Sequence, residues 1–279
     1  MVVPAYNEQD RLAGMLEEAI EVLDREYSSA NLEDTNGMRK RNVSNQRNGT
    51  SDSTASGPSA GWEILLVSDG SKDDTVSVAL DYAQRHPDGS IRVIALKSNR
   101  GKGGAVTHGM RHARGQFVMF ADADGASKFS DVVKLVHACE AAQDTQGRAV
   151  AVGSRAHLVG SDAVVQRSKL RNFLMHSFHL LLWFLTPQAT SRIKDTQCGF
   201  KSFSRQALPY IIPHMHSEGW IFDVEMLMLA ERANIPIVEV PIGWHEVKGS
   251  KLNVLWDSLG MAWGLGILRL AWAFGVYQT

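Results

Sequence analysis

Short apolar patterns typical of strands alternate with helical patterns along this chain. Apolar runs predict strands at residues 62–67, 91–96, 117–121 and 149–153. Apolar residues at helical spacing predict helices at residues 73–86, 103–113 and 130–142. Repeated strand–helix units of this length favour an α/β, Rossmann-like fold, with a mostly parallel central sheet and helices on both faces. In such folds ligands bind beyond the carboxyl ends of the strands.

Four consecutive predicted strands end in polar, acidic or glycine-rich loops. These loops comprise residues 4–8, 68–74, 98–104 and 122–125. Turns use such residue types anyway, but four loops at one edge of one sheet indicate a binding site. Neither the first nor the third loop fits a dinucleotide-binding or P-loop glycine pattern, which argues against a dehydrogenase and against a P-loop enzyme.

The loop after the fourth strand carries two aspartates, Asp122 and Asp124. Residues i and i+2 of an extended segment point the same way, so the two carboxylates form a hard oxygen site suited to Mg²⁺ or Mn²⁺. A metal there can bridge the phosphates of a nucleotide diphosphate. The alternative is structural, with Asp124 and Gly125 ending the strand in a turn or capping a helix.

The second and third loops suggest where a nucleotide binds. Asp69 directly follows a predicted buried strand, where it can accept hydrogen bonds from a uracil ring or a ribose hydroxyl. Its alternative role is to cap the helix that follows. Lys102 and the closely spaced N–H groups of 98–104 favour negative charge near a helix start.

Charge and composition exclude some functions. The formal net charge is −1, which gives no electrostatic case for nucleic acid as a partner. Residues 28–60 are rich in Ser, Asn and Gly and predict a disordered insertion. Pro4 leaves about two residues for the first strand, so we expect a leading segment, with the rest of that strand and a membrane anchor, before Met1.

These motifs resemble glycosyltransferase family 2, whose fold is the GT-A type. The resemblance rests on residues 3–8 (VPAYNE), 68–71 (SDGS), Asn99 with Gly101, and Asp122 with Asp124. A narrower resemblance, to the dolichyl-phosphate β-glucosyltransferase group, rests on residues 102–106, 120–126, 153–158, 171–176, 195–201, 222–225 and 249–252.

The resemblance implies transfer of glucose from UDP-glucose to dolichyl phosphate, with inversion and with Mg²⁺ or Mn²⁺ as cofactor. It implies the cytosolic face of the endoplasmic reticulum membrane as the location, and protein N-glycosylation as the use of the product. The residues expected to bind the nucleotide sugar are Pro4, Tyr6, Glu8, Asp69, Lys102, Asp122 and Gln197. The residues expected at the catalytic centre are Asp124, Arg155 and Asp223.

A phosphate acceptor sets its own requirements. The second pKa of a phosphate monoester is about 6, so the acceptor needs positioning and charge neutralisation more than deprotonation. We therefore expect Asp223 to orient substrate rather than act as a strong base; its alternative role is to cap a helix. The cations expected at the acceptor phosphate are Arg155, Arg167, Lys169 and Arg171, unless they form only a solvated face.

The domain organisation that we expect is a GT-A catalytic domain at 1–250 followed by a membrane-associating amphipathic helix at 251–279. Residues 168–186 contain an apolar segment too short to span a bilayer, which is either an interfacial or a core helix. Trp256, Trp263 and Trp272 favour an interfacial helix at the C-terminal end, with a packed core helix as the alternative.

Three other functions remain open at this point. The first is a polyprenyl-phosphate mannosyltransferase that uses GDP-mannose. The second is a family 2 enzyme acting on a sugar hydroxyl, which would require Asp223 as a true base. The third is a non-catalytic sugar-nucleotide-binding protein, against which the intact pair of Asp122 and Asp124 argues.

Overall fold

The computed structural model is described for residues 1–28, 61–88, 90–158, 181, 185–247 and 254–277. Except for Ser28, the predicted insertion at 28–60 lies outside the described residues. So do Arg167, Lys169 and Arg171, together with most of the apolar segment at 168–186.

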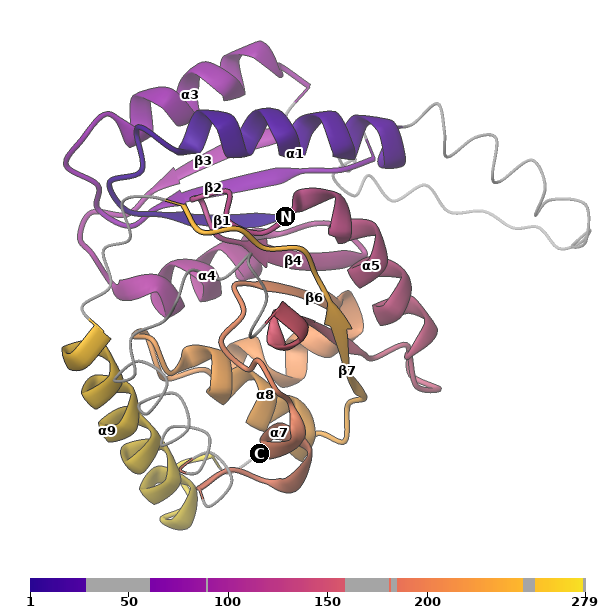
Figure 1. Cartoon of the computed structure of the whole chain (residues 1–279), viewed down its shortest axis with the longest axis vertical. Helices are drawn as coiled ribbons and strands as arrows, with labels where there is room; N and C mark the ends of the chain where they lie inside the picture. Colours follow the sequence, from indigo (N-terminus) through magenta and orange to yellow (C-terminus); the bar gives the residue numbers. More distant parts are fainter. Residues whose placement is uncertain (29–60, 89, 159–180, 182–184, 248–253, 278–279) are drawn as a thin grey trace, which may run out of the picture.

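One seven-stranded sheet organises the chain, in the order β3-β2-β1-β4-β6-β5-β7 (Figure 1). The strands are β1 (Val2–Ala5), β2 (Ile64–Ser68), β3 (Ile91–Ala95), β4 (Phe117–Ala121), β5 (Val150–Ser154), β6 (Phe200–Ser204) and β7 (Ile237–Pro241). Strand β6 runs antiparallel to both of its neighbours, β4 and β5. The other pairs are parallel, which confirms the predicted α/β class with a mostly parallel sheet.

Helices cover both faces of this sheet. The α-helices are α1 (Leu12–Tyr27), α3 (Thr75–Arg85), α4 (Gly101–His112), α5 (Val132–Ala141), α7 (Gln188–Arg192), α8 (Phe222–Arg232) and α9 (Val254–Ala273). Short 3₁₀ segments are η1 (Phe129–Asp131), η2 (Ala156–Leu158), η3 (Arg205–Tyr210) and η4 (Ile212–His214).

Alternation along the strands divides the core into two layers. In β1, Val2 belongs to the apolar cluster with α4 and α8, whereas Val3 belongs to the cluster with α1, α3 and α5. This is the period of two that a strand imposes on its side chains. Because β1, β2 and β4 are parallel and adjacent, their carboxyl ends meet at one edge, and the loops that follow them converge there.

The structure departs from the sequence prediction in three strands: β1 is longer than expected, and β6 and β7 were not predicted. The expectation that the first strand has only about two residues was wrong, because β1 continues through Pro4 and spans Val2–Ala5, with Pro4 opposite Val67. Within the described part of the chain, no helix combines the length and apolar character needed to cross a bilayer.

Candidate active site

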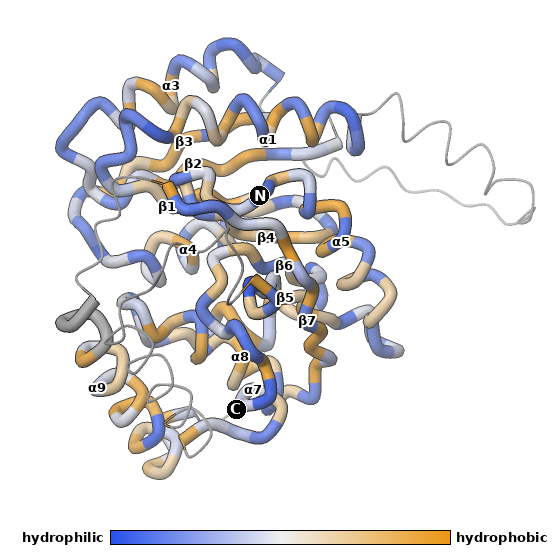
Figure 2. The backbone as a smooth tube through the Cα atoms, viewed as in Figure 1, coloured by the Kyte–Doolittle hydropathy of each residue, from blue (hydrophilic) through white to orange (hydrophobic). Residues whose placement is uncertain are grey.

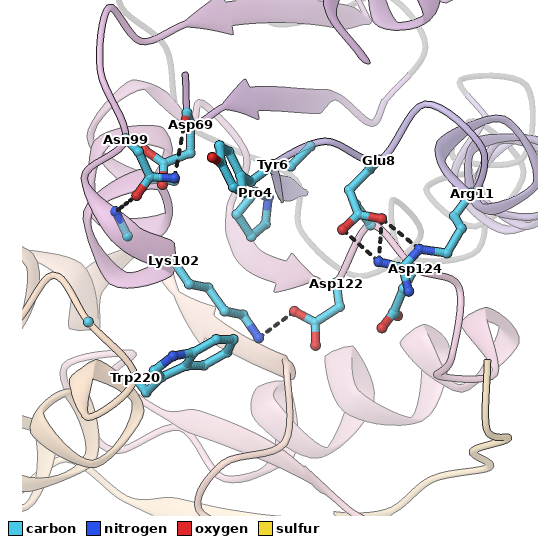
Figure 3. A pocket seen from close by; sticks show the side chains of 15 residues that line it. Pro4, Tyr6, Glu8, Arg11, Asp69, Asn99, Lys102, Asp122, Asp124 and Trp220 are labelled. Atoms are coloured by element: carbon cyan, nitrogen blue, oxygen red, sulfur yellow. Dashed lines mark hydrogen bonds and ion pairs between the residues drawn. The ribbon is translucent and has the colours of Figure 1, made fainter. Parts of the chain in front are cut away.

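A cavity of about 390 Å³ opens at the carboxyl edge of the sheet (Figure 3). It is lined by the end of β1, by the loops after β1, β2, β3 and β4, by the start of α4, and by Gly219 and Trp220 from the loop before α8. The structure brings seven of the predicted site residues together in its wall: Pro4, Tyr6, Glu8, Asp69, Lys102, Asp122 and Asp124.

Asp69 joins two of the loops that form this wall. Its Oδ1 accepts a hydrogen bond of 2.7 Å from the backbone N–H of Arg100, and Asn99 Nδ2 donates to its carbonyl oxygen at 3.1 Å. Burial raises the pKa of Asp69, although hydrogen bonds from the 100–101 backbone oppose that effect. The carboxylate thus meets the N-terminus of α4, rather than capping α3, the helix that follows it in sequence.

Lys102 supplies the positive charge in the cavity. It is the second residue of α4, and its Nζ lies 2.5 Å from Asp122 Oδ1. Burial lowers the pKa of Lys102, but the charges of Asp122 and Asp223 more than offset this, so the net shift is upward. The ammonium group that lines the cavity therefore stays charged.

The acidic pair after β4 combines both roles considered from the sequence. Asp124 Oδ1 accepts a 3.0 Å hydrogen bond from the N–H of Ala126, and Gly125 has a φ of +70°, so Asp124 does start a turn. It also lines the cavity, as Asp122 does. The structural and functional interpretations are therefore compatible.

These residues fit a divalent cation. Gly199, on the loop before β6, lies so close to Asp122 that a Cβ added there would overlap the Asp122 carboxylate. A glycine thus makes the space in which this carboxylate sits. The described residues contain no cluster of three or more His, Cys, Asp or Glu side chains that could hold a metal. Two carboxylates suit Mg²⁺ bound partly by substrate phosphates, because that ion is usually held by one or two carboxylates and keeps its other positions for such ligands.

Three cavity residues were not predicted from the sequence. Arg11 donates from Nε and Nη2 to the two Glu8 oxygens, each at 2.7 Å. Gly219 and Trp220 come from a loop far along the chain, and the Lys102 ammonium lies 6.0 Å from the centre of the Trp220 ring. The only sequence signal for Trp220 is an aromatic residue next to glycine just ahead of Phe222 and Asp223.

Three of the predicted site residues that the structure describes lie outside this cavity wall: Arg155, Gln197 and Asp223. Arg155, which follows β5, pairs with Asp195 through two bonds of 2.7 and 2.9 Å. Its guanidinium also lies 5.8 Å from the centre of the Trp244 ring. Gln197 Nε2 lies 2.6 Å from the Met261 sulfur of α9. Their predicted roles stay predictions.

Asp223 lies in the first turn of α8, also outside the cavity wall, and is only 3% exposed. Its partner is the buried Lys201 of β6, a residue that sequence reasoning missed. Burial raises the pKa of Asp223, while the charges of Lys201 and Lys102 oppose that rise. Ile221 is the N-cap residue of α8, so the capping role considered for Asp223 was wrong.

Comparison with known proteins places this geometry in a family. The model of the family described as glycosyl transferase family 2 matches residues 44–223. The dolichyl-phosphate β-glucosyltransferase of Saccharomyces cerevisiae is 43% identical over 287 residues, covering 100% of this chain and 76% of the yeast protein. The human protein of the same name is 40% identical over 279 residues, with the same two coverages.

A solved structure has the same fold. Glucosyl-3-phosphoglycerate synthase from Mycobacterium tuberculosis, in complex with Mn²⁺, UDP-glucose and phosphoglyceric acid, superimposes with a TM-score of 0.56 at 17% identity. The match covers 97% of this chain and 77% of that one. The chain belongs to glycosyl transferase family 2, in the group that contains the dolichyl-phosphate β-glucosyltransferases of yeast and human.

Proposed function

We propose that this protein transfers glucose from UDP-glucose to dolichyl phosphate, giving dolichyl β-D-glucosyl phosphate for lipid-linked oligosaccharide synthesis in protein N-glycosylation. The observation that carries the proposal is the convergence of Asp69, Lys102, Asp122 and Asp124 in one cavity. They converge in a chain that is 40–43% identical to enzymes of that name from yeast and human.

The donor would occupy the cavity at the sheet edge. Asp69 suits the uracil or ribose part of the donor, because its carboxylate can accept hydrogen bonds from these groups. The Arg100 N–H holds that carboxylate in place between two loops. Lys102 suits the diphosphate, since among the residues that the structure describes it is the one lysine in the cavity wall. Asp122 and Asp124 would hold Mg²⁺ or Mn²⁺, which when bound stabilises the diphosphate as a leaving group.

The reaction would be a single displacement with inversion. An oxygen of the acceptor phosphate forms a bond to the anomeric carbon, while the bond from that carbon to the diphosphate breaks and UDP leaves with the electron pair. The acceptor is largely dianionic at neutral pH, since its second pKa is about 6. No strong base is needed, which suits an Asp223 carboxylate already paired with Lys201.

The acceptor would approach from a membrane surface, on the cytosolic face of the endoplasmic reticulum. Large exposed apolar side chains of the described chain gather on and just beyond α9: Leu259, Trp263, Ile267, Leu270, Phe274 and Val276. Trp263 is 74% and Phe274 81% exposed, whereas Leu265 on the opposite face is fully buried. Figure 2 shows how apolar α9 is along its described length. The helix is thus apolar on both faces: one face packs on the protein through Leu265, and the exposed face, with its tryptophan, suits the interfacial layer of a bilayer.

Substituting the exposed face of α9 tests the membrane proposal. Trp263→Ser combined with Phe274→Ser is expected to weaken binding to phospholipid vesicles at least about tenfold, because two large apolar side chains no longer leave water. Leu80→Ser is the matched control, since Leu80 is an exposed apolar residue of α3 and is 45% exposed. Flotation of all variants with vesicles measures the effect. Equal binding by the double variant and the wild type would count against this surface.

Trp220 is expected to contribute to donor binding. Removing its ring in Trp220→Ala takes away one apolar wall of the cavity and the cation–π contact with Lys102, so the KM for UDP-glucose should rise about tenfold. Trp220→Phe should stay close to wild type. Tyr210→Ala is the control, because Tyr210 has the same exposed fraction of 43% and does not line the cavity. Steady-state kinetics that show the same KM in Trp220→Ala would remove this role.

The donor specificity can be tested directly. Purified protein in detergent receives dolichyl phosphate, Mn²⁺ and either UDP-glucose or GDP-mannose, and the lipid product is analysed by chromatography. The proposal predicts a glucolipid from UDP-glucose alone. A mannolipid would move the substrate assignment to GDP-mannose, and binding of UDP-glucose with no lipid product would favour a non-catalytic protein.

A further inference from the structure

Lys201 is a charged residue that is fully buried within the central sheet. It is the second residue of β6, and its exposed fraction is 0%. Lysine is almost never fully buried unless it is paired, because removing its charge from water is costly. Its ammonium group donates to a carboxylate oxygen of Asp223 and, at 2.6 Å, to the carbonyl of Cys198.

The partners of Lys201 lead to the acidic pair by two routes. Cys198 precedes Gly199, where an added Cβ would overlap the Asp122 carboxylate. The Lys201 ammonium also lies 5.3 Å from the centre of the Phe120 ring, and Phe120 stands two residues before Asp122 on β4. A change at Lys201 would therefore act on both sides of Asp122.

Charges alternate in sign from Lys201 toward the cavity. Lys201 pairs with Asp223, the charge of Asp223 acts on Lys102, and Lys102 pairs with Asp122. These four groups come from β6, α8, α4 and the end of β4. Of these four side chains, only Lys201 is fully buried, whereas Lys102 and Asp122 are partly exposed in the cavity. Lys201 is therefore the side chain with the least freedom to move when substrate enters.

We propose that Lys201 is a positioning residue that holds the Asp223 carboxylate, and the 198–199 loop beside Asp122, in the geometry that glucose transfer requires. The inference rests on the proposed function, because it deepens the account of the same site. A buried ion pair is weak support for a stabilising role, since apolar replacements of such pairs are often neutral or favourable. The role in positioning is inferred instead from the contacts that connect Lys201, through Cys198 and Gly199, to the Asp122 carboxylate.

The test is a double-mutant cycle on Lys201 and Asp223. Lys201→Gln keeps a hydrogen-bond donor but removes the charge, and Asp223→Asn removes the partner charge. Lys201→Gln is expected to lower kcat about a hundredfold, with the KM for UDP-glucose changed less than about threefold. In the Asp223→Asn background it should add almost no further loss, because its effect passes through Asp223.

Arg148→Gln is the matched control, because Arg148 forms a half-buried ion pair with Asp144 at 2.8 Å, away from the cavity wall. It should lose stability but keep kcat. If Lys201→Gln does not fold, Lys201→Arg takes its place in the cycle: a loss in kcat in the wild-type background that is absent in the Asp223→Asn background supports positioning. Additive losses in kcat, or a kcat in Lys201→Gln equal to that of Arg148→Gln, would overturn the inference. Failure of the proposed function would show separately, in a wild type that makes no glucolipid.

Discussion

Replacing Asp124 with asparagine is expected to lower the rate of glucose transfer about a thousandfold, because the divalent cation loses a charged oxygen ligand worth several kcal/mol. The fold should survive. Asparagine keeps the side-chain oxygen that accepts the 3.0 Å bond from Ala126, so the turn at Gly125 is retained.

Asp144→Asn is the control for this prediction. Asp144 Oδ1 likewise accepts a hydrogen bond from the residue two positions on, Gln146, at 2.9 Å, and it lies outside the cavity wall. Initial rates over a range of Mn²⁺ concentrations compare the two variants. An Asp124→Asn enzyme with wild-type rate and wild-type metal dependence would show that this aspartate forms only the turn.

Gly199→Ala is the second variant from which we expect a large effect. The added Cβ would overlap the Asp122 carboxylate, and the side chain that can yield is that of Asp122. A displaced metal ligand should lower kcat/KM for UDP-glucose about a hundredfold, with no comparable loss of thermal stability. Raising the Mn²⁺ concentration should recover part of the activity.

Gly14→Ala is the matched control for this glycine. Gly14 lies in α1 with nothing within 4 Å of an added Cβ, and alanine there should stabilise the protein by about 0.5–1 kcal/mol without changing activity. Thermal melts and initial rates separate the two variants. If Gly199→Ala keeps full activity at limiting Mn²⁺, Asp122 does not need its present position.

Much of the fold follows from local patterns in the sequence. The strands β2, β3, β4 and β5 were predicted because continuous apolar runs mark buried parallel strands. Strand β6 was not predicted, since one lysine and two serines within Phe200–Ser204 interrupt any continuous apolar run. Its lysine is compatible with a buried strand only because Asp223, on another element, neutralises it.

The site was predictable where it depends on sheet topology. Parallel strands bring their carboxyl ends to one edge of the sheet, so the sequence alone predicted that Asp69 and Asp122 lie in the same site. Trp220 and Lys201 could not, because each reaches the site through the packing of α8 and β6 against the sheet. For Arg155, the position after β5 was predictable from the sequence, but its bidentate pairing with Asp195 was not.

The most direct test of the central claim is the transfer of labelled glucose from UDP-glucose to dolichyl phosphate, measured with Mn²⁺, with EDTA, and with Mn²⁺ restored after EDTA. We predict a glucolipid that disappears with EDTA and returns with Mn²⁺, and that Asp124→Asn forms about a thousandfold more slowly than the wild type when Mn²⁺ is present. Transfer that continues in EDTA, or that Asp124→Asn supports at the wild-type rate, would contradict the assignment of Asp122 and Asp124 as the metal site of a glucosyltransferase.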